Sequence, residues 1–197
     1  MLANLRAYRL FWVLAGAVLV FDQATKAWID AILPFPTYFP NGGPGGESPI
    51  VIIPGFFQLV HIGNEGAAWG LLSGYRSVLI LVAIGALVAI YCFRRSLELT
   101  LPVMQVAFGL IVGGIVGNLL DRIIYHHVVD FLDVHLPGIA FLGIPPYRWP
   151  AFNVADSAIC CGVIFYLILS FFPPKGSQAY LEKQTNAKRS GSDRESS

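Results

Sequence analysis

The sequence predicts an all-α integral membrane protein with four transmembrane helices and, on one side of the membrane, a small β-sheet with a loop cover. Of its 197 residues, 55% are hydrophobic and 13% charged, where soluble domains carry about 25% charged residues. The apolar residues also fall in long runs rather than in the stripe of an amphipathic helix. These two observations exclude a soluble globule. The net charge of +1, with no basic block, gives no indication of a nucleic-acid partner.

Four segments are long enough to cross roughly 30 Å of hydrocarbon, which requires about 20 mostly apolar residues. The expected helices cover residues 10–33, 77–93, 101–121 and 154–172. For the first segment a secretory signal peptide is the alternative, because Arg6 and Arg9 precede the apolar stretch. The helical pattern nevertheless continues through Trp28 and Ile32 without a clear cleavage site, which favours a span.

The distribution of positive charge predicts the orientation of the chain. If the N-terminus is cytoplasmic, nine of the 13 Lys and Arg residues lie on the cytoplasmic side. The outer side then holds only Lys26, Arg76, Arg122 and Arg148. Because positive residues favour the cytoplasm, we expect both termini there. Residues 1–172 form one domain in this interpretation, and residues 173–197 form a cytoplasmic tail whose low hydrophobicity predicts disorder.

Two outer segments connect the helices. The stretch from Pro34 to Pro49 is rich in Pro and Gly and predicts a loop. The β-branched and aromatic residues that follow predict short outer strands within residues 50–72. The second segment, Ile123 to Ala151, mixes apolar and polar residues with four prolines, and we expect a loop with partial structure there.

Ionisable residues collect near the outer ends of the helices, although such residues are costly within spans and mark functional sites by default. At about 1.5 Å per residue, Asp121 lies roughly 30 Å above Leu101 and Asp156 roughly 24 Å above Phe172. These carboxylates therefore converge near the outer boundary of the membrane.

Helical spacing groups further polar residues with them. Asn118, Asp121 and Arg122 share one face of the third helix, and Asp22 and Lys26 share one face of the first. Ion pairs and helix caps without chemistry are the alternative interpretation.

Three glycines, Gly109, Gly113 and Gly117, form a small-residue face along which a second helix can approach closely. This face ends at Asn118, so a helix packed on it would lie against the polar residues.

A pair of aspartates is the candidate for hydrolytic chemistry. Such a pair needs one ionised carboxylate to take a proton from water and one protonated carboxyl to hold the carbonyl oxygen. Two neighbouring carboxyl groups share a proton because they cannot both ionise cheaply. Asp130 and Asp156 flank the second outer segment, 26 positions apart. Taken alone this signal is weak, since any two aspartates flanking a loop would qualify.

The polar residues are also compatible with two other classes of function. A metal-dependent hydrolase would use the ligand types His126, His127, Asp130, Asp133 and His135, but their spacing matches no common zinc pattern. A transporter or channel that relays protons would need ionisable residues through the whole membrane. The inner third of each span lacks them, which argues against a relay.

Five motifs occur in the order found in the bacterial lipoprotein signal peptidases, or type II signal peptidases. They are FDQATKAWI in the first helix, NEGAAWG at 64–70, GGIVGNLLDR at 113–122, VVDF at 128–131 and FNVADS at 152–157. The resemblance covers roughly residues 10–172. It implies an inner-membrane aspartic endopeptidase that removes the signal peptide from prolipoproteins, cleaving just before a cysteine that carries a diacylglyceryl group.

Carried over by motif, the resemblance implies that Asp130 and Asp156 are the catalytic dyad. The residues that would support the dyad or bind the substrate are Asp22, Lys26, Asn64, Gly66, Asn118, Asp121, Arg122 and Asn153. The resemblance implies no metal or cofactor. The implied partners are lipid-modified prolipoproteins and membrane lipids, and the implied state is a monomer with its active site near the periplasmic face.

The resemblance also implies an outer sheet and a periplasmic helix over the site. Three departures concern this cover. Trp69 stands where the family usually has Phe, Glu65 stands where a small or hydroxyl residue is common, and the Pro34–Pro49 loop is longer than usual.

Overall fold

In the residues that it describes, the computed structural model of this chain has four long helices and a small antiparallel sheet. The structure describes residues 7–36, 49–67, 71–138 and 145–172. The helices are α2 (Arg9–Ile32), α3 (Arg76–Phe93), α4 (Pro102–Ile124) and α5 (Val154–Phe171). The strands are β1 (Ile50–Ile53), β2 (Phe57–Asn64), β3 (Val128–Leu136) and β4 (Tyr147–Arg148), in the spatial order β1-β2-β3-β4. All four helices are long and apolar enough to cross a membrane, which confirms the four predicted spans.

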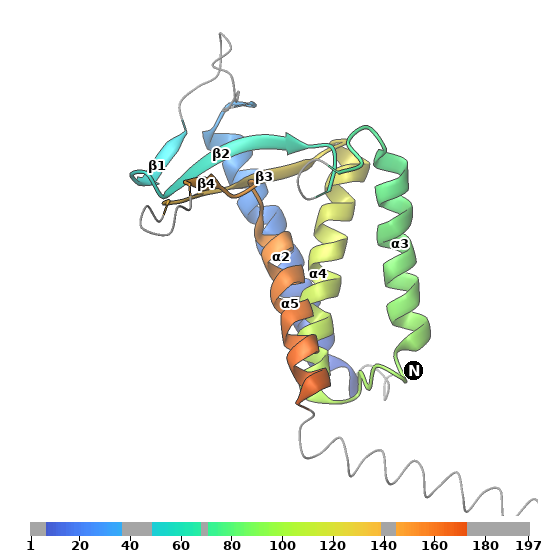
Figure 1. Cartoon of the computed structure of the whole chain (residues 1–197). Coiled ribbons are helices and arrows are strands. Elements are labelled where there is room, and N and C mark those ends of the chain that lie inside the picture. Colours follow the sequence, from blue (N-terminus) through green and yellow to red (C-terminus); the bar gives the residue numbers. More distant parts are fainter. Residues whose placement is uncertain (1–6, 37–48, 68–70, 139–144, 173–197) are drawn as a thin grey trace, which may run out of the picture.

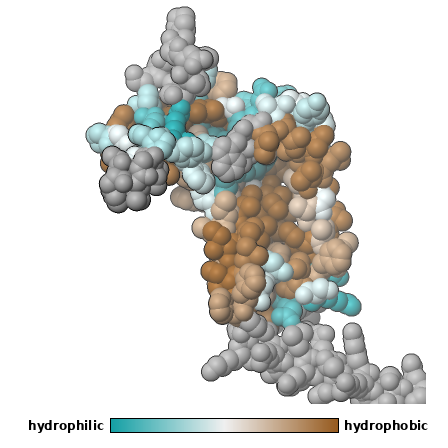
Figure 2. All heavy atoms as spheres, in the orientation of Figure 1, coloured by the Kyte–Doolittle hydropathy of each residue, from teal (hydrophilic) through white to brown (hydrophobic). Residues whose placement is uncertain are grey.

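The sheet lies across one end of the helices, which we call the sheet end (Figure 1). Helix α4 occupies the centre and has the most buried residues, whereas no residue of α3 is buried. Figure 2 shows hydrophobic surface along the helices and hydrophilic residues at the sheet end and at the opposite end. This arrangement is the one expected of helices surrounded by lipid.

Glycines allow α4 to contact two helices closely. A Cβ atom added at Gly113 would lie 2.7 Å from the carbonyl oxygen of Ala15 on α2. On the α5 side, a Cβ at Gly162 would lie 2.7 Å from the carbonyl oxygen of Ala107 on α4. The predicted close approach along the glycine face of α4 is therefore confirmed, with α2 as the partner.

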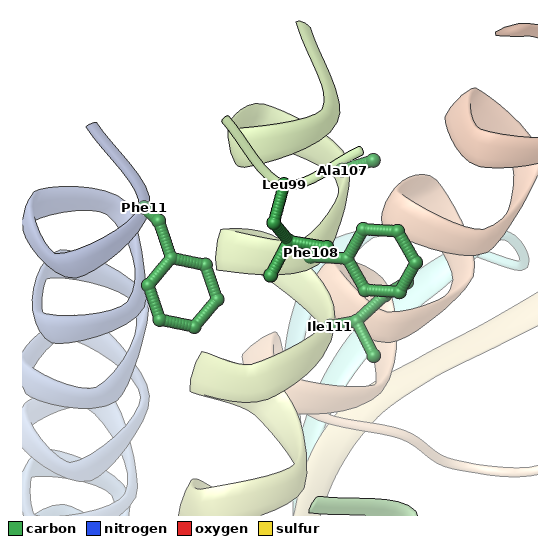
Figure 3. Packing of buried hydrophobic residues seen from close by; sticks show 5 residues of the cluster. All are labelled: Phe11, Leu99, Ala107, Phe108 and Ile111. Atoms are coloured by element: carbon green, nitrogen blue, oxygen red, sulfur yellow. The ribbon is translucent and has the colours of Figure 1, made fainter. Parts of the chain in front are cut away.

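A hydrophobic cluster holds the helices together at the end opposite the sheet. Phe11 of α2 packs with Leu99, Ala107, Phe108 and Ile111 (Figure 3). The buried amide of Gln105 adds a polar link there, because its Oε1 accepts from the Phe11 N–H at 3.2 Å and its Nε2 donates to the Ala7 carbonyl at 2.6 Å.

The second outer segment is more regular than the predicted loop. It contains β3, whose nine residues pair with β2 in a register that places Val134 opposite Phe57 and Asp130 opposite Ile62. The four prolines that favoured a loop all lie outside β3, so none removes a donor from this ladder.

The remaining predictions for the outer segments have mixed outcomes. The first pair of strands ends at Asn64 rather than continuing to residue 72. Between β2 and α3, the described residues 66–67 and 71–74 form bends and turns, and the described residues of this connection contain no helix of the kind that the resemblance implies over the site. Trp69, most of the Pro34–Pro49 loop and the tail from residue 173 lie outside the described residues.

Candidate active site

Asp130 and Asp156 come from different elements and meet through one asparagine. Asp130 lies on β3, and Asp156 lies in the first turn of α5. Asn153 is the N-cap of α5: its Oδ1 accepts from the Asp156 N–H at 2.9 Å, and its own N–H donates to Asp156 Oδ2 at 3.2 Å, which is a reciprocal capping box. The Nδ2 of Asn153 also donates to Asp130 Oδ1 at 2.8 Å.

Backbone pairing explains why β3 and the start of α5 lie together. The Phe152 N–H donates to the Leu132 carbonyl at 3.1 Å, and the Leu132 N–H donates back at 2.8 Å. This bridge fixes the chain just before the Asn153 cap, so the cap and its helix begin beside the strand that carries Asp130.

The environment of Asp130 favours its protonated form. The residue is 2% exposed, and its Oδ2 accepts from Asn64 Nδ2 at 2.9 Å. Burial and the nearby charge of Asp156 raise the pKa of Asp130 to about 8, against the opposing effect of the hydrogen bonds from Asn64 and Asn153. At neutral pH the carboxyl group of Asp130 therefore holds a proton that it can donate.

A buried ion cluster supports the pair from the α2 side. The Lys26 ammonium lies 2.7 Å from Asp22 Oδ2 and 2.7 Å from Asp121 Oδ2, and all three side chains are at most 4% exposed. Asp22 Oδ1 accepts from the Ala155 N–H at 2.9 Å, so the cluster also fixes the first turn of α5.

Helix α4 connects this cluster to both aspartates. Asn118 donates from Nδ2 to Asp156 Oδ1 at 2.7 Å, and its Oδ1 accepts from Lys26 Nζ at 3.1 Å. Asp121 Oδ2 accepts from the Val129 N–H at 3.3 Å, one residue before Asp130. The face of α4 that the spacing predicted thus contacts β3 and α5 together.

Arg122 holds the segment that follows β2. Its Nη2 donates to the Gly66 carbonyl at 2.8 Å, and the Gly66 N–H donates to Asn64 Oδ1 at 2.9 Å. Asn64 in turn contacts Asp130, so this chain of contacts runs from α4 to the pair. Within the described part of the chain, the buried Nε of Arg122 has no hydrogen-bond partner. Because the Arg122 guanidinium interacts electrostatically with both Asp156 and Asp130, this Nε is a spare donor near the pair.

The structure brings together all ten residues that the sequence singled out, and it adds one that was missed. Gln23 donates from Nε2 to Asp121 Oδ1 at 2.8 Å and to Asp22 Oδ2 at 3.2 Å. The available signal was an amide next to Asp22 within an apolar span, where polar side chains are expensive.

Asp133 belongs to a separate network, which the sequence analysis also missed. Side chains alternate between the two faces of a strand, so residues an odd number of positions apart point to opposite faces. Asp130 and Asp133 are three positions apart and therefore project to different sides of β3. Arg148 of β4 binds Asp133 with two hydrogen bonds, at 2.8 and 2.9 Å, and Gln58 of β2 adds one at 2.6 Å. This network joins three strands and lies away from the Asp130–Asp156 pair.

The histidines of the metal alternative have different surroundings. His135 contacts Asp133 at 3.1 Å, and His127 stacks on Phe35. His126 lines a surface depression of about 330 Å³ with Glu65 and others. Among the described residues, no three His, Cys, Asp or Glu side chains are grouped so as to hold a metal ion.

Comparison with known proteins identifies the family. A family model described as signal peptidase (SPase) II matches residues 14–172. The lipoprotein signal peptidase of Oleidesulfovibrio alaskensis is 38% identical over 164 residues, 78% of this chain and 89% of the relative. That of Nitratidesulfovibrio vulgaris is 40% identical over 172 residues, 85% of this chain and 92% of the relative.

Solved structures give the same result. A bacterial membrane enzyme determined by the in meso method at 2.3 Å resolution matches with a TM-score of 0.66 and 32% identity, covering 81% of this chain and 85% of its own. A second, at 1.9 Å resolution, matches with a TM-score of 0.64 and 31% identity, covering 82% of this chain and 92% of its own. The chain therefore belongs to the signal peptidase II family, a family of proteases.

Proposed function

We propose that this protein is an aspartic endopeptidase that removes the signal peptide from diacylglyceryl-modified prolipoproteins, cleaving just before the lipidated cysteine. One observation carries the aspartic mechanism: the buried carboxyl group of Asp130 and the half-buried one of Asp156 share Asn153 as a hydrogen-bond partner at the sheet end of four apolar helices. Relatives named lipoprotein signal peptidase support the class of substrate.

The chemistry follows from a pair that shares one proton. The ionised carboxylate takes a proton from water while the water oxygen bonds to the scissile carbonyl carbon. The protonated carboxyl donates to the carbonyl oxygen and stabilises the tetrahedral intermediate. The proton taken from water then passes to the amide nitrogen as the C–N bond breaks, so neither a metal nor a covalent enzyme intermediate is needed.

The spare donor of Arg122 provides a place for the substrate backbone. Its buried Nε, unpaired within the described part of the chain, is suited to a peptide carbonyl near the two carboxyl groups. The Asn64–Gly66 segment that Arg122 holds would cover the same peptide. In this proposal the eight supporting residues position the pair or hold the substrate backbone.

The location of the pair at the end of the helices suits a substrate with a lipid anchor. Asp156 lies in the first turn of α5, and the rest of that helix carries no charge. Acyl chains would therefore lie in the bilayer while the scissile bond lies at its boundary. Such chains add about 0.8 kcal/mol of affinity per buried CH₂ group.

We further propose that the sheet end faces the periplasm in the inner membrane. Arg9 begins α2, and Arg94 and Arg95 follow the end of α3. These helix ends lie away from the sheet (Figure 1), and the positive-inside rule assigns them to the cytoplasm. Both termini are then cytoplasmic, with residues 1–172 as one domain and residues 173–197 as a tail. Because one chain supplies both aspartates, a monomer suffices for activity.

The function is tested with two synthetic prolipoprotein peptides in detergent, identical except that one carries the diacylglyceryl group on its cysteine. We expect cleavage just before the cysteine in the lipidated peptide, identified by product mass, and much slower cleavage of the unlipidated one. If folded protein cleaves neither peptide, the proposed substrate is wrong. If it cleaves both equally well, the lipid is not recognised.

A further inference from the structure

We propose that Lys26 is a positioning residue that acts through the Asn118 amide to keep Asp156 ionised, which makes Asp156 the base and leaves the shared proton on Asp130. This inference rests on the proposed aspartic mechanism and deepens it by assigning the two roles. It depends on the direction in which a single amide group points.

The chemistry of Lys26 fixes the orientation of Asn118. An ammonium group has three donors and no acceptor, so the atom that faces it must be an acceptor. Accordingly Asn118 presents Oδ1 to Lys26 Nζ at 3.1 Å, and the same oxygen accepts from Asn153 Nδ2 at 3.2 Å. A flipped amide would set its NH₂ group against two donors.

The orientation of the Asn118 amide then determines which of its atoms contacts Asp156. Asn118 Nδ2 can only donate, and it lies 2.7 Å from Asp156 Oδ1. Asp156 Oδ2 accepts from the Asn153 N–H at the positive end of α5. Both oxygens therefore receive hydrogen bonds that favour the charged form, one from an amide polarised by a cation and one at a helix N-terminus.

The hydrogen bonds to Asp130 favour its charged form less than those to Asp156 do. Its two donors are the amides of Asn64 and Asn153, whose oxygens accept from the backbone N–H groups of Gly66 and Asp156 rather than from a cation. Asp130 also lies on a strand, and both hydrogen bonds to its oxygens come from side-chain amides, whereas Asp156 also accepts from a backbone N–H at a helix N-terminus. When the two carboxyl groups hold a single proton between them, that proton is therefore on Asp130.

The charges around the pair agree with this assignment. The ionisable groups that face it are Asp22 and Lys26 from α2, Asp121 and Arg122 from α4, Asp130 from β3, and Asp156 and Cys160 from α5. With Asp130 and the thiol protonated, three carboxylates face two cations. Lys26 is shared by Asp22 and Asp121, so its loss would leave Arg122 as the cation that faces the pair among the residues that the structure describes.

The test is the pH profile of kcat/KM for Lys26→Met with the lipidated peptide. Without the cation the Asn118 amide is free to turn, and Asp156 holds a proton to higher pH. We expect the acidic limb to move up by about one pH unit. At pH values on that limb, the loss of kcat/KM relative to the wild type is then about tenfold larger than the loss on the plateau. A purely structural loss would lower all pH values equally.

Gln105→Leu is the matched control, because it removes another buried polar contact between α2 and α4 far from the pair. Its acidic limb should coincide with that of the wild type. If Lys26→Met gives too little folded protein, Lys26→Met/Asp121→Asn keeps the net charge of the ion cluster and is compared with Asp121→Asn alone. The same shift of about one pH unit is expected between those two variants.

An acidic limb that coincides with that of the matching control overturns the role of Lys26. That result is distinguishable from failure of the proposed function. If Asp130→Asn and Asp156→Asn both abolish cleavage while the acidic limb of Lys26→Met does not move, the catalytic dyad is supported. Only the proposal that Lys26 keeps Asp156 ionised is then wrong. If either aspartate variant cleaves normally, the aspartic mechanism itself fails.

Discussion

Replacing Gly113 by alanine tests whether the close contact of α2 with α4 sets the geometry of the site. The added Cβ would lie 2.7 Å from both the Ala15 carbonyl oxygen and the Val18 Cβ, well inside ordinary van der Waals contact. Because one of these neighbours is backbone, α2 itself must move away. Overpacking of this kind costs about 1–3 kcal/mol, and alanine recovers about 0.5–1 kcal/mol over glycine within a helix.

The expected result is a loss of stability together with a larger loss of activity. Helix α2 carries Asp22 and Lys26, and a displacement near 1 Å at a catalytic site can cost about 10²-fold in rate. We expect the thermal midpoint in detergent to fall by about 2–4 °C for each kcal/mol lost, and kcat/KM for the lipidated peptide to fall further than stability accounts for.

Gly16→Ala is the matched control for this experiment. It adds the same methyl group to α2, but no described atom outside the adjoining stretch of α2 lies within 4 Å of the added Cβ. Its kcat/KM should match that of the wild type, and its midpoint should equal or slightly exceed that of the wild type, because alanine gains about 0.5–1 kcal/mol over glycine within a helix. If Gly113→Ala is as stable and as active as Gly16→Ala, the reasoning from close helix contact is refuted.

Three further predictions concern pH and metal. Because burial and the Asp156 charge raise the pKa of Asp130 to about 8, kcat/KM should fall about tenfold per pH unit above pH 8; a profile flat to pH 10 would contradict the need for a shared proton. Although burial acts to raise the pKa of Asp133, hydrogen bonds from Arg148, Gln58 and His135 lower it. The ionised form of Asp133 therefore stabilises the fold above its unfolded pKa of about 4. The thermal midpoint of Asp133→Asn should lie below that of the wild type at pH 7. This difference in midpoint should disappear as the pH falls below about 4. Equal midpoints at pH 7 would show that the Asp133 network adds no stability. The rate of cleavage should not change when a chelator is added. Loss of cleavage with chelator and its recovery with Zn²⁺ would instead support a metal-dependent hydrolase with histidine ligands.

Local patterns in the sequence predicted the features that depend on them. Long apolar runs predicted the four spans, and helical spacing placed Asn118, Asp121 and Arg122 on one face of α4. The glycine repeat predicted the close approach of a second helix. Each of these inferences uses residues within one or two helices, for which the sequence spacing directly gives the geometry.

Features that depend on contacts distant in sequence were not predictable from spacing. Strand β3 was interpreted as part of a loop, because its partner β2 lies some 70 positions earlier and prolines flank it. The pairing of Asp133 with Arg148 depends on that strand alignment. Gln23 was missed because an amide beside Asp22 has no spacing rule that indicates a distant partner such as Asp121.

The resemblance to a family supplied what neither spacing nor composition could. Any two aspartates flanking a loop would have qualified as a pair, and the motifs selected Asp130 and Asp156. The structure adds the physical link between them, which is the Asn153 cap that contacts both carboxyl groups.

The central claim is that Asp130 and Asp156 together perform the cleavage, and it is tested most directly by replacing each with asparagine. Asp133→Asn is the matched control, since it makes the same change to a buried aspartate on β3 outside the site. The folded fraction of each variant is measured first, and cleavage of the lipidated peptide is then compared. We predict no detectable cleavage by Asp130→Asn or Asp156→Asn and retained cleavage by Asp133→Asn. Normal cleavage by either of the first two variants would contradict the account.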